Sequence, residues 1–342
     1  MSVSLPIAVD AMGGDFAPEP EVFGAIEAVD AGIGPVVLFG AEARVESVLG
    51  ARGISRSAPG LEVVNADSVV TMDDHPAEVL RNKRDSSLAL AFDSARAGRS
   101  GGVVSAGNSG AMMAFAVRTL GRLPGVDRPA IACPYPTKKG VAVLCDAGAN
   151  TECRPLQLAQ FGVMGAAYAR LILGAKRPRV AVLSNGSEGV KGTALTREAS
   201  EMLQGARTDA FDFAGYVEGR DVVEGEIDVV VTDGFTGNVT LKVIEGVGMA
   251  VTEILKGEVK KRTFAKAGAL LMKPALLSMK ARFDYAQYGG APLVGVDGVA
   301  IVCHGGSPAR AIRNAIRVAR GFVNQKVGDE IVRVLRETGL GR

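Results

Sequence analysis

The sequence is poor in the residues that build metal and redox sites. Its 342 residues include no tryptophan and only two histidines, His75 and His304. It has four cysteines, none of them in a C-x-x-C pair: Cys133, Cys145, Cys153 and Cys303. This spacing argues against a structural zinc site. We therefore expect no bound metal and four reduced thiols, as in a cytosolic protein.

Long apolar runs are also missing. No stretch approaches the roughly 18 uninterrupted apolar residues of a membrane-spanning helix. The N-terminus has neither the basic region nor the apolar core of a secretory signal, so we expect a cytoplasmic protein. With 47% hydrophobic and 22% charged residues the chain is not disordered. Only 5% of the residues are aromatic and no nucleic-acid-binding motif occurs, so we expect no nucleic-acid partner.

Glycine, in contrast, is abundant, with 44 residues. Five short apolar runs each end in a loop rich in Gly, Asp, Asn or Ser, and a helical pattern follows each loop. These runs are residues 5–10, 102–104, 141–145, 179–183 and 228–232, and further strands are predicted at 35–39, 61–65 and 299–303. Continuous Val, Ile and Leu suit parallel strands buried on both faces. We predict one α/β domain over residues 1–342, a doubly wound, mostly parallel Rossmann-like sheet with helices on both faces.

The five polar loops indicate an anionic ligand. Ligands of doubly wound sheets bind beyond the carboxyl ends of the strands, where we expect all five loops to open. Glycine-rich turns at helix N-termini present N–H groups to phosphate or carboxylate. Yet no G-x-G-x-x-G follows the first strand, and residues 186–193 lack the ending of a P-loop, so a nucleotide cofactor is not expected. The candidate substrate-binding residues are Asp10, Gly13, Gly14, Ser105, Asn108, Ser109, Asn150, Asp233, Gly237 and His304.

Two further polar side chains stand out in these loops. Lys191 lies in a glycine-flanked loop after a predicted buried strand, where an ammonium group can meet a phosphate or a developing oxyanion. Asn238 closes another loop and can donate its amide to the same oxygen. Each also has an ordinary interpretation, as a solvated lysine and as a helix-capping asparagine.

The segment 256–282 differs from the rest of the chain. It carries eight basic residues and one acid, a net charge of +7, whereas the whole chain is +2. Apolar residues alternate with the basic ones, which predicts a basic amphipathic helical hairpin over 250–285, joined near Pro274. Such a hairpin suits an anionic membrane or an acidic partner, or packs on the core or on a second subunit. The residues expected to make this contact are Lys260, Lys261, Arg262, Phe264, Leu270, Leu271 and Leu277.

Six stretches in order resemble the phosphate acyltransferase (PlsX) family of bacterial phospholipid synthesis. They are residues 7–15 (IAVDAMGGD), 105–111 (SAGNSGA), 125–130 (GVDRPA), 231–239 (VTDGFTGNV), 288–293 (YGGAPL) and 304–307 (HGGS). The resemblance implies that inorganic phosphate attacks the thioester of a long-chain acyl carrier protein, which gives an acyl phosphate. It also implies that a membrane glycerol-3-phosphate acyltransferase then uses this product.

The resemblance has further implications for the site and the partners. Lys191 and Asn238 become the catalytic pair, and no cofactor is needed. The protein is expected to be a cytoplasmic homodimer, peripherally associated with the inner face of an anionic membrane. Other basic surface, for which Arg118, Arg122 and Arg128 are candidates, is expected to dock the carrier protein.

The loop before Lys191 departs from the family pattern, since Ser184 and Ser187 replace an asparagine and an acid. Two alternatives stay open. One is another doubly wound enzyme, such as an acetyl-phosphate-forming transferase or a metal-dependent decarboxylating dehydrogenase. Its aspartate cluster would be formed by Asp10, Asp15, Asp146 and Asp233. The other alternative is a non-catalytic adaptor between a carrier protein and the membrane.

Overall fold

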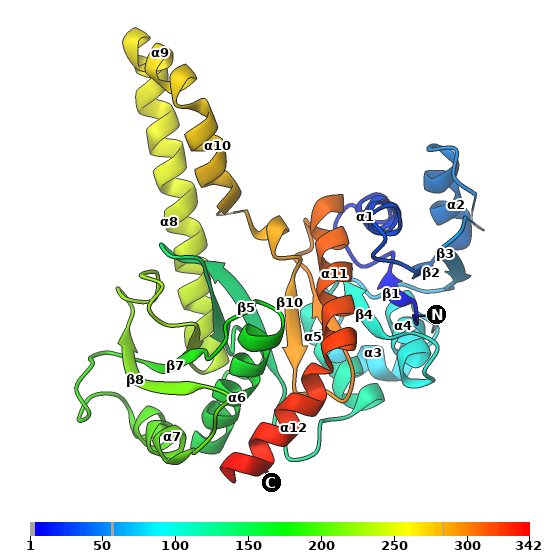
Figure 1. Ribbon diagram of the computed structural model, residues 1–342. Coiled ribbons are helices and arrows are strands. Elements are labelled where there is room, and N and C mark those ends of the chain that lie inside the picture. Colours follow the sequence, from blue (N-terminus) through cyan, green and yellow to red (C-terminus); the bar gives the residue numbers. More distant parts are fainter. Residues whose placement is uncertain (1–3, 56–57, 283) are drawn as a thin grey trace.

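The computed structural model describes residues 4–55, 58–282 and 284–342 (Figure 1). Its strands form one eleven-stranded sheet in the order β3-β2-β1-β4-β11-β10-β5-β6-β9-β7-β8. The strands are β1 (Ile7–Asp10), β2 (Val36–Gly40), β3 (Leu61–Asn65), β4 (Gly102–Ser105), β5 (Ala130–Pro136), β6 (Val141–Cys145), β7 (Arg179–Ser184), β8 (Asp212–Glu218), β9 (Val229–Val231), β10 (Ala291–Val294) and β11 (Ala300–Val302).

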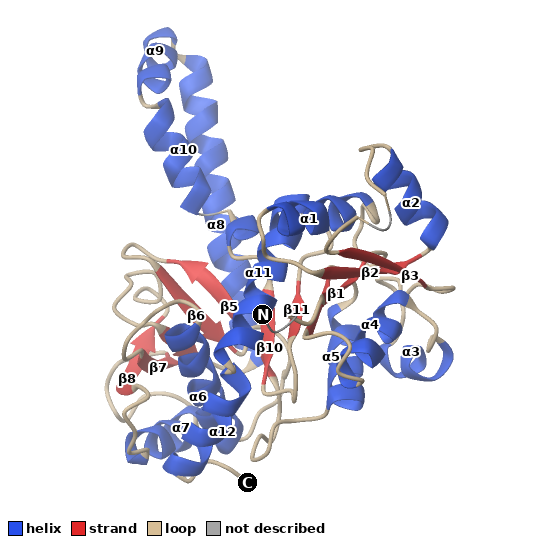
Figure 2. Cartoon of the chain, turned by 45° about the vertical axis from the view of Figure 1, so that its right-hand side comes forward, coloured by secondary structure: helices blue, strands red, loops and turns tan. Residues whose placement is uncertain are grey.

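Helices cover both faces of this sheet, as predicted (Figure 2). The α-helices are α1 (Glu19–Asp30), α2 (Glu42–Gly50), α3 (Pro76–Asn82), α4 (Ser87–Arg96), α5 (Ser109–Phe115), α6 (Pro155–Leu171), α7 (Ala194–Gly205), α8 (Gly234–Lys261), α9 (Thr263–Leu271), α10 (Lys273–Arg282), α11 (Ala309–Gln325) and α12 (Val327–Thr338). Two short helices of other types complete the set, η1 (Ala116–Leu120) and η2 (Tyr285–Gln287).

Side-chain alternation along the strands separates the core into two layers. Ile7 and Val9 of β1 pack with α1, α11, α12, α6 and α7 on one face of the sheet. Ala8, between them, packs with α3, α4 and α5 on the other face. Helix α8 covers that second face farther along, where Leu241 and Ile244 lie against β5 and β6. The predicted doubly wound α/β sheet with helices on both faces is confirmed.

The sheet consists of two parallel halves that point in opposite directions. Strands β3, β2, β1, β4 and β11 are mutually parallel, and so are β6, β9, β7 and β8. Between them β10 is antiparallel to β11 and to β5, and β5 is antiparallel to β6. Three reversals leave the two halves opposed. The expectation that all five polar loops open at one edge is therefore wrong: two open at one edge of the sheet and three at the opposite edge.

The strands that the sequence did not predict explain this difference. Strand β5 contains Pro134 and Pro136, β8 contains Gly215, and β10 contains Pro292. Proline and glycine are the residues that argue against a strand, because proline donates no ladder hydrogen bond and glycine packs no side chain. Strands β5 and β10 are the two that reverse the direction of the sheet.

The predicted hairpin projects from the body of the molecule (Figure 1). Its first arm, α8, starts at Gly234, well before the predicted residue 250. The chain leaves the helical path at Arg262 and again at Met272, and α10 returns alongside α8 in both views. Pro274 lies in the first turn of α10, where its missing N–H costs no hydrogen bond. Residue 283, near the predicted end of the hairpin, lies outside the described residues.

Candidate active site

A buried carboxylate, Asp146, organises the loop after β6. Its side chain accepts hydrogen bonds from the backbone N–H groups of Ile131, Gly148, Ala149 and Asn150 at 2.7–3.3 Å. The Asn150 amide adds a fifth bond at 2.9 Å. Burial raises the pKa of Asp146, and these hydrogen bonds act in the opposite direction. Because Asp146 follows the strand directly, it determines the path of the whole loop.

Asn238 lies next to this loop, in the first turns of α8. The helix is capped by Asp233, whose carboxylate accepts hydrogen bonds from the Thr236 N–H and hydroxyl at 2.8 and 2.7 Å. Gly237 lies so close to the Asp146 carbonyl that a Cβ there would come within 1.9 Å of the oxygen, so only glycine fits. The next residue is Asn238, whose side chain lies over Gly148, with its Cγ 3.7 Å from the position that a Cβ of residue 148 would take.

Lys191 lies in the loop that follows β7. The Asn185 side chain accepts a hydrogen bond from the Gly192 N–H at 2.9 Å and closes this loop. Gly192 has a φ of +86°, a left-handed conformation that glycine adopts without strain. The aliphatic part of Lys191 packs over Gly186, where a Cβ would lie 2.7 Å from its Cγ. The ammonium group is thus held at the end of a short, tied loop.

The sheet places these two loops side by side. Strand β9 lies between β6 and β7 and is parallel to both, so their carboxyl ends adjoin at one edge. Lys191 and Asn238 are both exposed. Within the described part of the chain, neither the Lys191 ammonium nor the Asn238 amide has a side-chain hydrogen bond or ion pair. A cation, an amide donor and the N-terminus of α8 therefore remain available to an anionic substrate.

The other predicted binding residues of this edge support the loops. The Asn150 side-chain amide donates one hydrogen bond to the Pro129 carbonyl, at 2.8 Å, and another to the Asp146 carboxylate. Both N–H donors of this amide are therefore used. The Asn150 carbonyl accepts from the Gly234 N–H at 2.7 Å. Asn150, Asp233 and Gly237 thus hold the frame around Asn238.

The remaining predicted residues lie at the opposite edge of the sheet. The buried Asp10 accepts a hydrogen bond from the Ser105 hydroxyl at 2.7 Å, and Gly13 packs against both residues. Burial raises the pKa of Asp10. The Asn108 side-chain amide, at the N-terminus of α5, donates hydrogen bonds to the backbone carbonyls of Thr71, Met72 and Asp74. The structure does not bring this group to Lys191 and Asn238.

Three further predicted residues surround the Asp10 loop. Gly14 lies against the buried carboxylate of Glu21. Ser109 is exposed at the start of α5. The exposed His304 accepts a hydrogen bond from the Gly306 N–H at its Nδ1, at 3.1 Å, after β11.

The structure offers no support for metal or thiol chemistry in the residues it describes. No group of three or more His, Cys, Asp and Glu side chains lies together there as a metal site, so the four aspartates considered above form no cluster. Burial raises the pKa of Cys133 and of Cys303 to about 12, and that of Cys145 well above its ordinary value. Thiols that hold their protons so firmly are poor nucleophiles.

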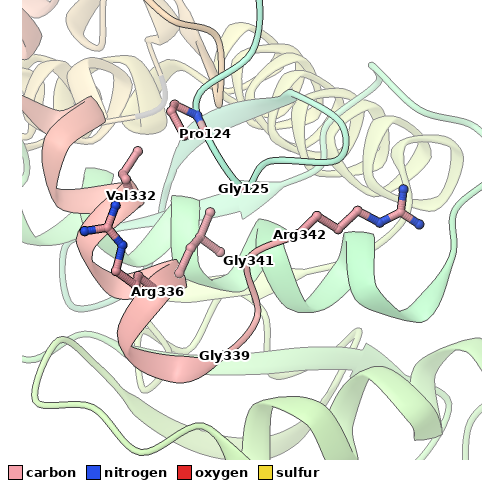
Figure 3. A pocket seen from close by; sticks show the side chains of 8 residues that line it. Pro124, Gly125, Val332, Arg336, Gly339, Gly341 and Arg342 are labelled. Atoms are coloured by element: carbon pink, nitrogen blue, oxygen red, sulfur yellow. The ribbon is translucent and has the colours of Figure 1, made fainter.

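Two hollows of the described surface are lined by neither Lys191 nor Asn238. One, of about 300 Å³, lies between α12, the C-terminal residues and the loop before β5 (Figure 3). Its rim carries Arg336 and Arg342. The other, of about 330 Å³, includes Gly101 and Val299 at the amino ends of β4 and β11. Neither is lined by a residue that the sequence predicted for the site.

The site residues predicted for acyl transfer include neither Asp146 nor Asp127, although Asp146 was considered as a metal ligand of the alternative dehydrogenase. Both are almost completely buried, with 0% and 5% of their surface exposed. The only signal for Asp146 was its place after a strand and before Ala-Gly-Ala-Asn, a pattern typical of a side chain that bonds to the following backbone. For Asp127 the signal was its place within the matching stretch 125–130.

The fold is similar to that of several solved structures. A phosphotransacetylase from Streptococcus pyogenes superposes with a TM-score of 0.65 at 18% identity, covering 94% of each chain. A 4-hydroxythreonine-4-phosphate dehydrogenase from Klebsiella pneumoniae gives 0.54 at 15% identity, covering 94% of this chain and all of the other. At such identities the likeness concerns the fold alone.

Sequence relatives show the family. The family described as "Fatty acid synthesis protein" matches residues 5–330. A phosphate acyltransferase of Syntrophotalea carbinolica is 49% identical over 97% of this chain and 94% of its own. One of Myxococcus xanthus is 51% identical over 96% and 93%. The chain belongs to this family of phosphate acyltransferases and is an enzyme of the transferase class.

Proposed function

We propose that the protein transfers a long-chain fatty acyl group from the thioester of an acyl carrier protein to inorganic phosphate. The products are an acyl phosphate and the free carrier. A membrane glycerol-3-phosphate acyltransferase then consumes the acyl phosphate in phosphatidic acid synthesis. The names of the relatives and the family support acyl transfer to phosphate. The donor and the pathway follow from the resemblance of six sequence stretches.

The mechanism needs little more than two positioned groups. A phosphate oxygen attacks the carbonyl carbon, a C–O bond forms, the C–S bond breaks, and the thiolate leaves and takes a proton from solvent. Lys191 neutralises the phosphate, and the Asn238 amide donates to the carbonyl oxygen as its negative charge develops. Phosphate is already a nucleophile and thiolate a good leaving group, so no Ser-His-Asp triad is required. The observation that carries this proposal is the adjacency of two exposed, unengaged side chains on neighbouring loops.

We further propose that the protein is a cytoplasmic homodimer that binds peripherally to an anionic membrane. None of the described helices is long and apolar enough to cross a bilayer. The hairpin instead carries exposed apolar side chains among its basic residues: Phe264 is 94% and Leu271 84% exposed. This combination supports binding at a membrane surface.

The direct test is phosphate-dependent release of free carrier from palmitoyl carrier protein, with the acyl phosphate trapped by hydroxylamine. We expect both products with the unmodified protein and neither without phosphate. Lys191→Ala and Asn238→Ala should each lower kcat/KM by about 100-fold or more, the usual effect of removing a group that stabilises an oxyanion. Both side chains are exposed, so the free energy of unfolding should be unchanged.

Lys176→Ala is the matched control, because Lys176 is an exposed lysine at the amino end of β7. Release of carrier without hydroxamate would show a thioesterase instead. No acyl transfer by the unmodified protein, with membrane and carrier binding that Lys191→Ala leaves intact, would favour the adaptor.

A further inference from the structure

Four arginines lie at or next to Asp127, and two of them form ion pairs with its buried carboxylate. Arg154 and Arg342 both form ion pairs with Asp127, the second at 2.8 Å. Arg122 donates to the Asp127 carbonyl, and Arg128 is the next residue in the chain. Burial raises the pKa of Asp127, but the Gln157 hydrogen bond and the arginines outweigh it and hold the pKa below its ordinary value. We call these four residues the arginine cluster.

The arginine cluster is directly connected to the frame around Asn238. Pro129, which follows Arg128, accepts the Asn150 amide hydrogen bond at 2.8 Å. The Asn150 carbonyl in turn accepts the first N–H of α8, from Gly234. Burial raises the pKa of Cys153, beside Asn150, to about 12, and the charge of Arg128 acts in the opposite direction. The segment that carries Arg128 is therefore linked to the N-terminus of α8 by two hydrogen bonds, through Pro129 and Asn150.

The charges of this surface are not balanced. All four guanidinium side chains are exposed, whereas Asp127 is 5% exposed and already has two partners. Glu152 is the other acid on the segments 122–130 and 150–154. Arg128 has no hydrogen bond or ion pair in the described part of the chain. The hollow in Figure 3 adjoins the cluster through Gly125 and Arg342 and adds Arg336 at its rim.

We propose that the arginine cluster is the docking surface for the acidic carrier protein. This assignment rests on the proposed function, since it names where the acyl donor binds. A row of acidic side chains on a carrier helix complements several exposed guanidinium groups, which steers encounter and fixes orientation. A carrier docked there delivers its thioester beside Asn238. The basic hairpin lies on a separate projection (Figure 1) and takes no part in this contact.

Arg128→Glu tests the proposal without disturbing the fold, because Arg128 is exposed and holds no partner. We expect KM for palmitoyl carrier protein to rise about tenfold with kcat little changed, the effect of losing roughly 1.4 kcal/mol of binding. Arg128→Gln should give a smaller rise. The dependence of KM on salt should become weaker in both variants.

Two controls separate the docking role from other roles. The same acyl group on free, uncharged pantetheine should react equally well with the unmodified protein and with Arg128→Glu. Lys176→Glu, which reverses a charge elsewhere on the surface, should leave KM for the acyl carrier unchanged.

Three outcomes would overturn the assignment. An unchanged KM for the acyl carrier in Arg128→Glu excludes docking at this surface. A raised KM for phosphate with the pantetheine substrate shows that the cluster binds phosphate instead. Equal losses with both acyl donors show a structural effect. If the unmodified protein transfers no acyl group from any thioester to phosphate, the proposed function itself fails, and this result is distinct from the other three.

Discussion

At the scale of single residues, the acidic side chains in the loops stabilise the loop conformations by hydrogen bonds. The Lys191 ammonium group and the Asn238 amide remain available to a substrate. Asp146, Asp127 and Asp233 each accept hydrogen bonds from neighbouring backbone or side chains. A buried carboxylate without such donors is costly, so these loops are specified by them. Lys191 and Asn238 carry no such duty in the described chain, which is what a substrate-binding pair requires.

Glu21 is the exception among the buried acids. It is 1% exposed, and its Oε2 has no hydrogen-bond partner in the described part of the chain. Burial raises its pKa from 4.5 to about 7, and the charges of Asp10 and Asp15 add to this. The unfolded chain therefore loses this proton first as the pH rises, and the free energy of unfolding falls between pH 4.5 and about 7.

Glu21→Gln should remove this pH dependence. Relative to the variant, the unmodified protein should lose about 2 to 3 kcal/mol of unfolding free energy between about pH 5 and 8. Urea unfolding at both pH values measures it. Glu19→Gln, an exposed position on the same helix, is the matched control and should follow the unmodified protein. The same change of unfolding free energy with pH in Glu21→Gln and in the unmodified protein would contradict the prediction.

At the scale of elements, the hairpin is held by its own helices and leaves its apolar residues in solvent. Helix α9 has no buried residue among those described, and Phe264, Leu270 and Leu271 are 94%, 71% and 84% exposed. Such surface is rarely left open in a protein that works alone in water. Lys260, Lys261 and Arg262 lie where α8 gives way to α9, so charge and apolar surface occur together.

Replacing Phe264 and Leu271 together by Asp should abolish binding to vesicles that contain anionic lipid. Each substitution removes apolar contact with the bilayer worth roughly 1.5–3 kcal/mol and adds a negative charge that the anionic lipids repel. Acyl transfer in solution and the midpoint of thermal unfolding should not change, because neither side chain is buried. Co-sedimentation with vesicles measures binding, and Met202→Asp on α7 is the control. Undiminished binding by the double variant would exclude the hairpin tip as the membrane contact.

At the scale of the whole molecule, α8 presents a second apolar surface, a stripe with a spacing of four residues. Its members are all at least half exposed: Phe235, Val239, Val243, Val247 and Val251. Residues four apart lie on one face of a helix, so these side chains form a continuous strip along the projecting arm. A second copy of the chain, placed antiparallel or parallel, can cover this strip in the proposed homodimer.

Val243→Glu combined with Val247→Glu should convert the dimer to a monomer of 35.3 kDa. Burying unpaired carboxylates in an apolar interface costs several kcal/mol, enough to weaken association at least about 100-fold. Sedimentation velocity at micromolar concentration measures the mass. Thr252→Glu on the same helix, outside the strip, serves as the comparison. A dimer that survives the double variant would place the interface elsewhere.

Local patterning in the sequence predicted much of this architecture. Continuous apolar runs identified the strands of both parallel halves except β8, and polar residues after them identified the loops. Strands β5 and β10 were missed because prolines in each argue against a strand, and a tertiary setting overrode that preference. Lys191 and Asn238 were found from residue type and family resemblance. The structural roles of Asp146 and Asp127 were missed because an aspartate that bonds within its own loop looks like any polar loop residue.

The sequence by itself therefore determined the fold class and the basic hairpin, because each follows from local composition and spacing. The candidate pair came from residue type together with the family resemblance. Only the tertiary structure decided which loops meet. Three antiparallel pairings at the centre of the sheet reverse one half against the other, which separates Asp10, Ser105 and His304 from Lys191 and Asn238. The tertiary structure also brought Arg154 and Arg342, which are distant in the chain, to Asp127. Strand pairing and ion pairing over long separations depend on packing that no local pattern encodes.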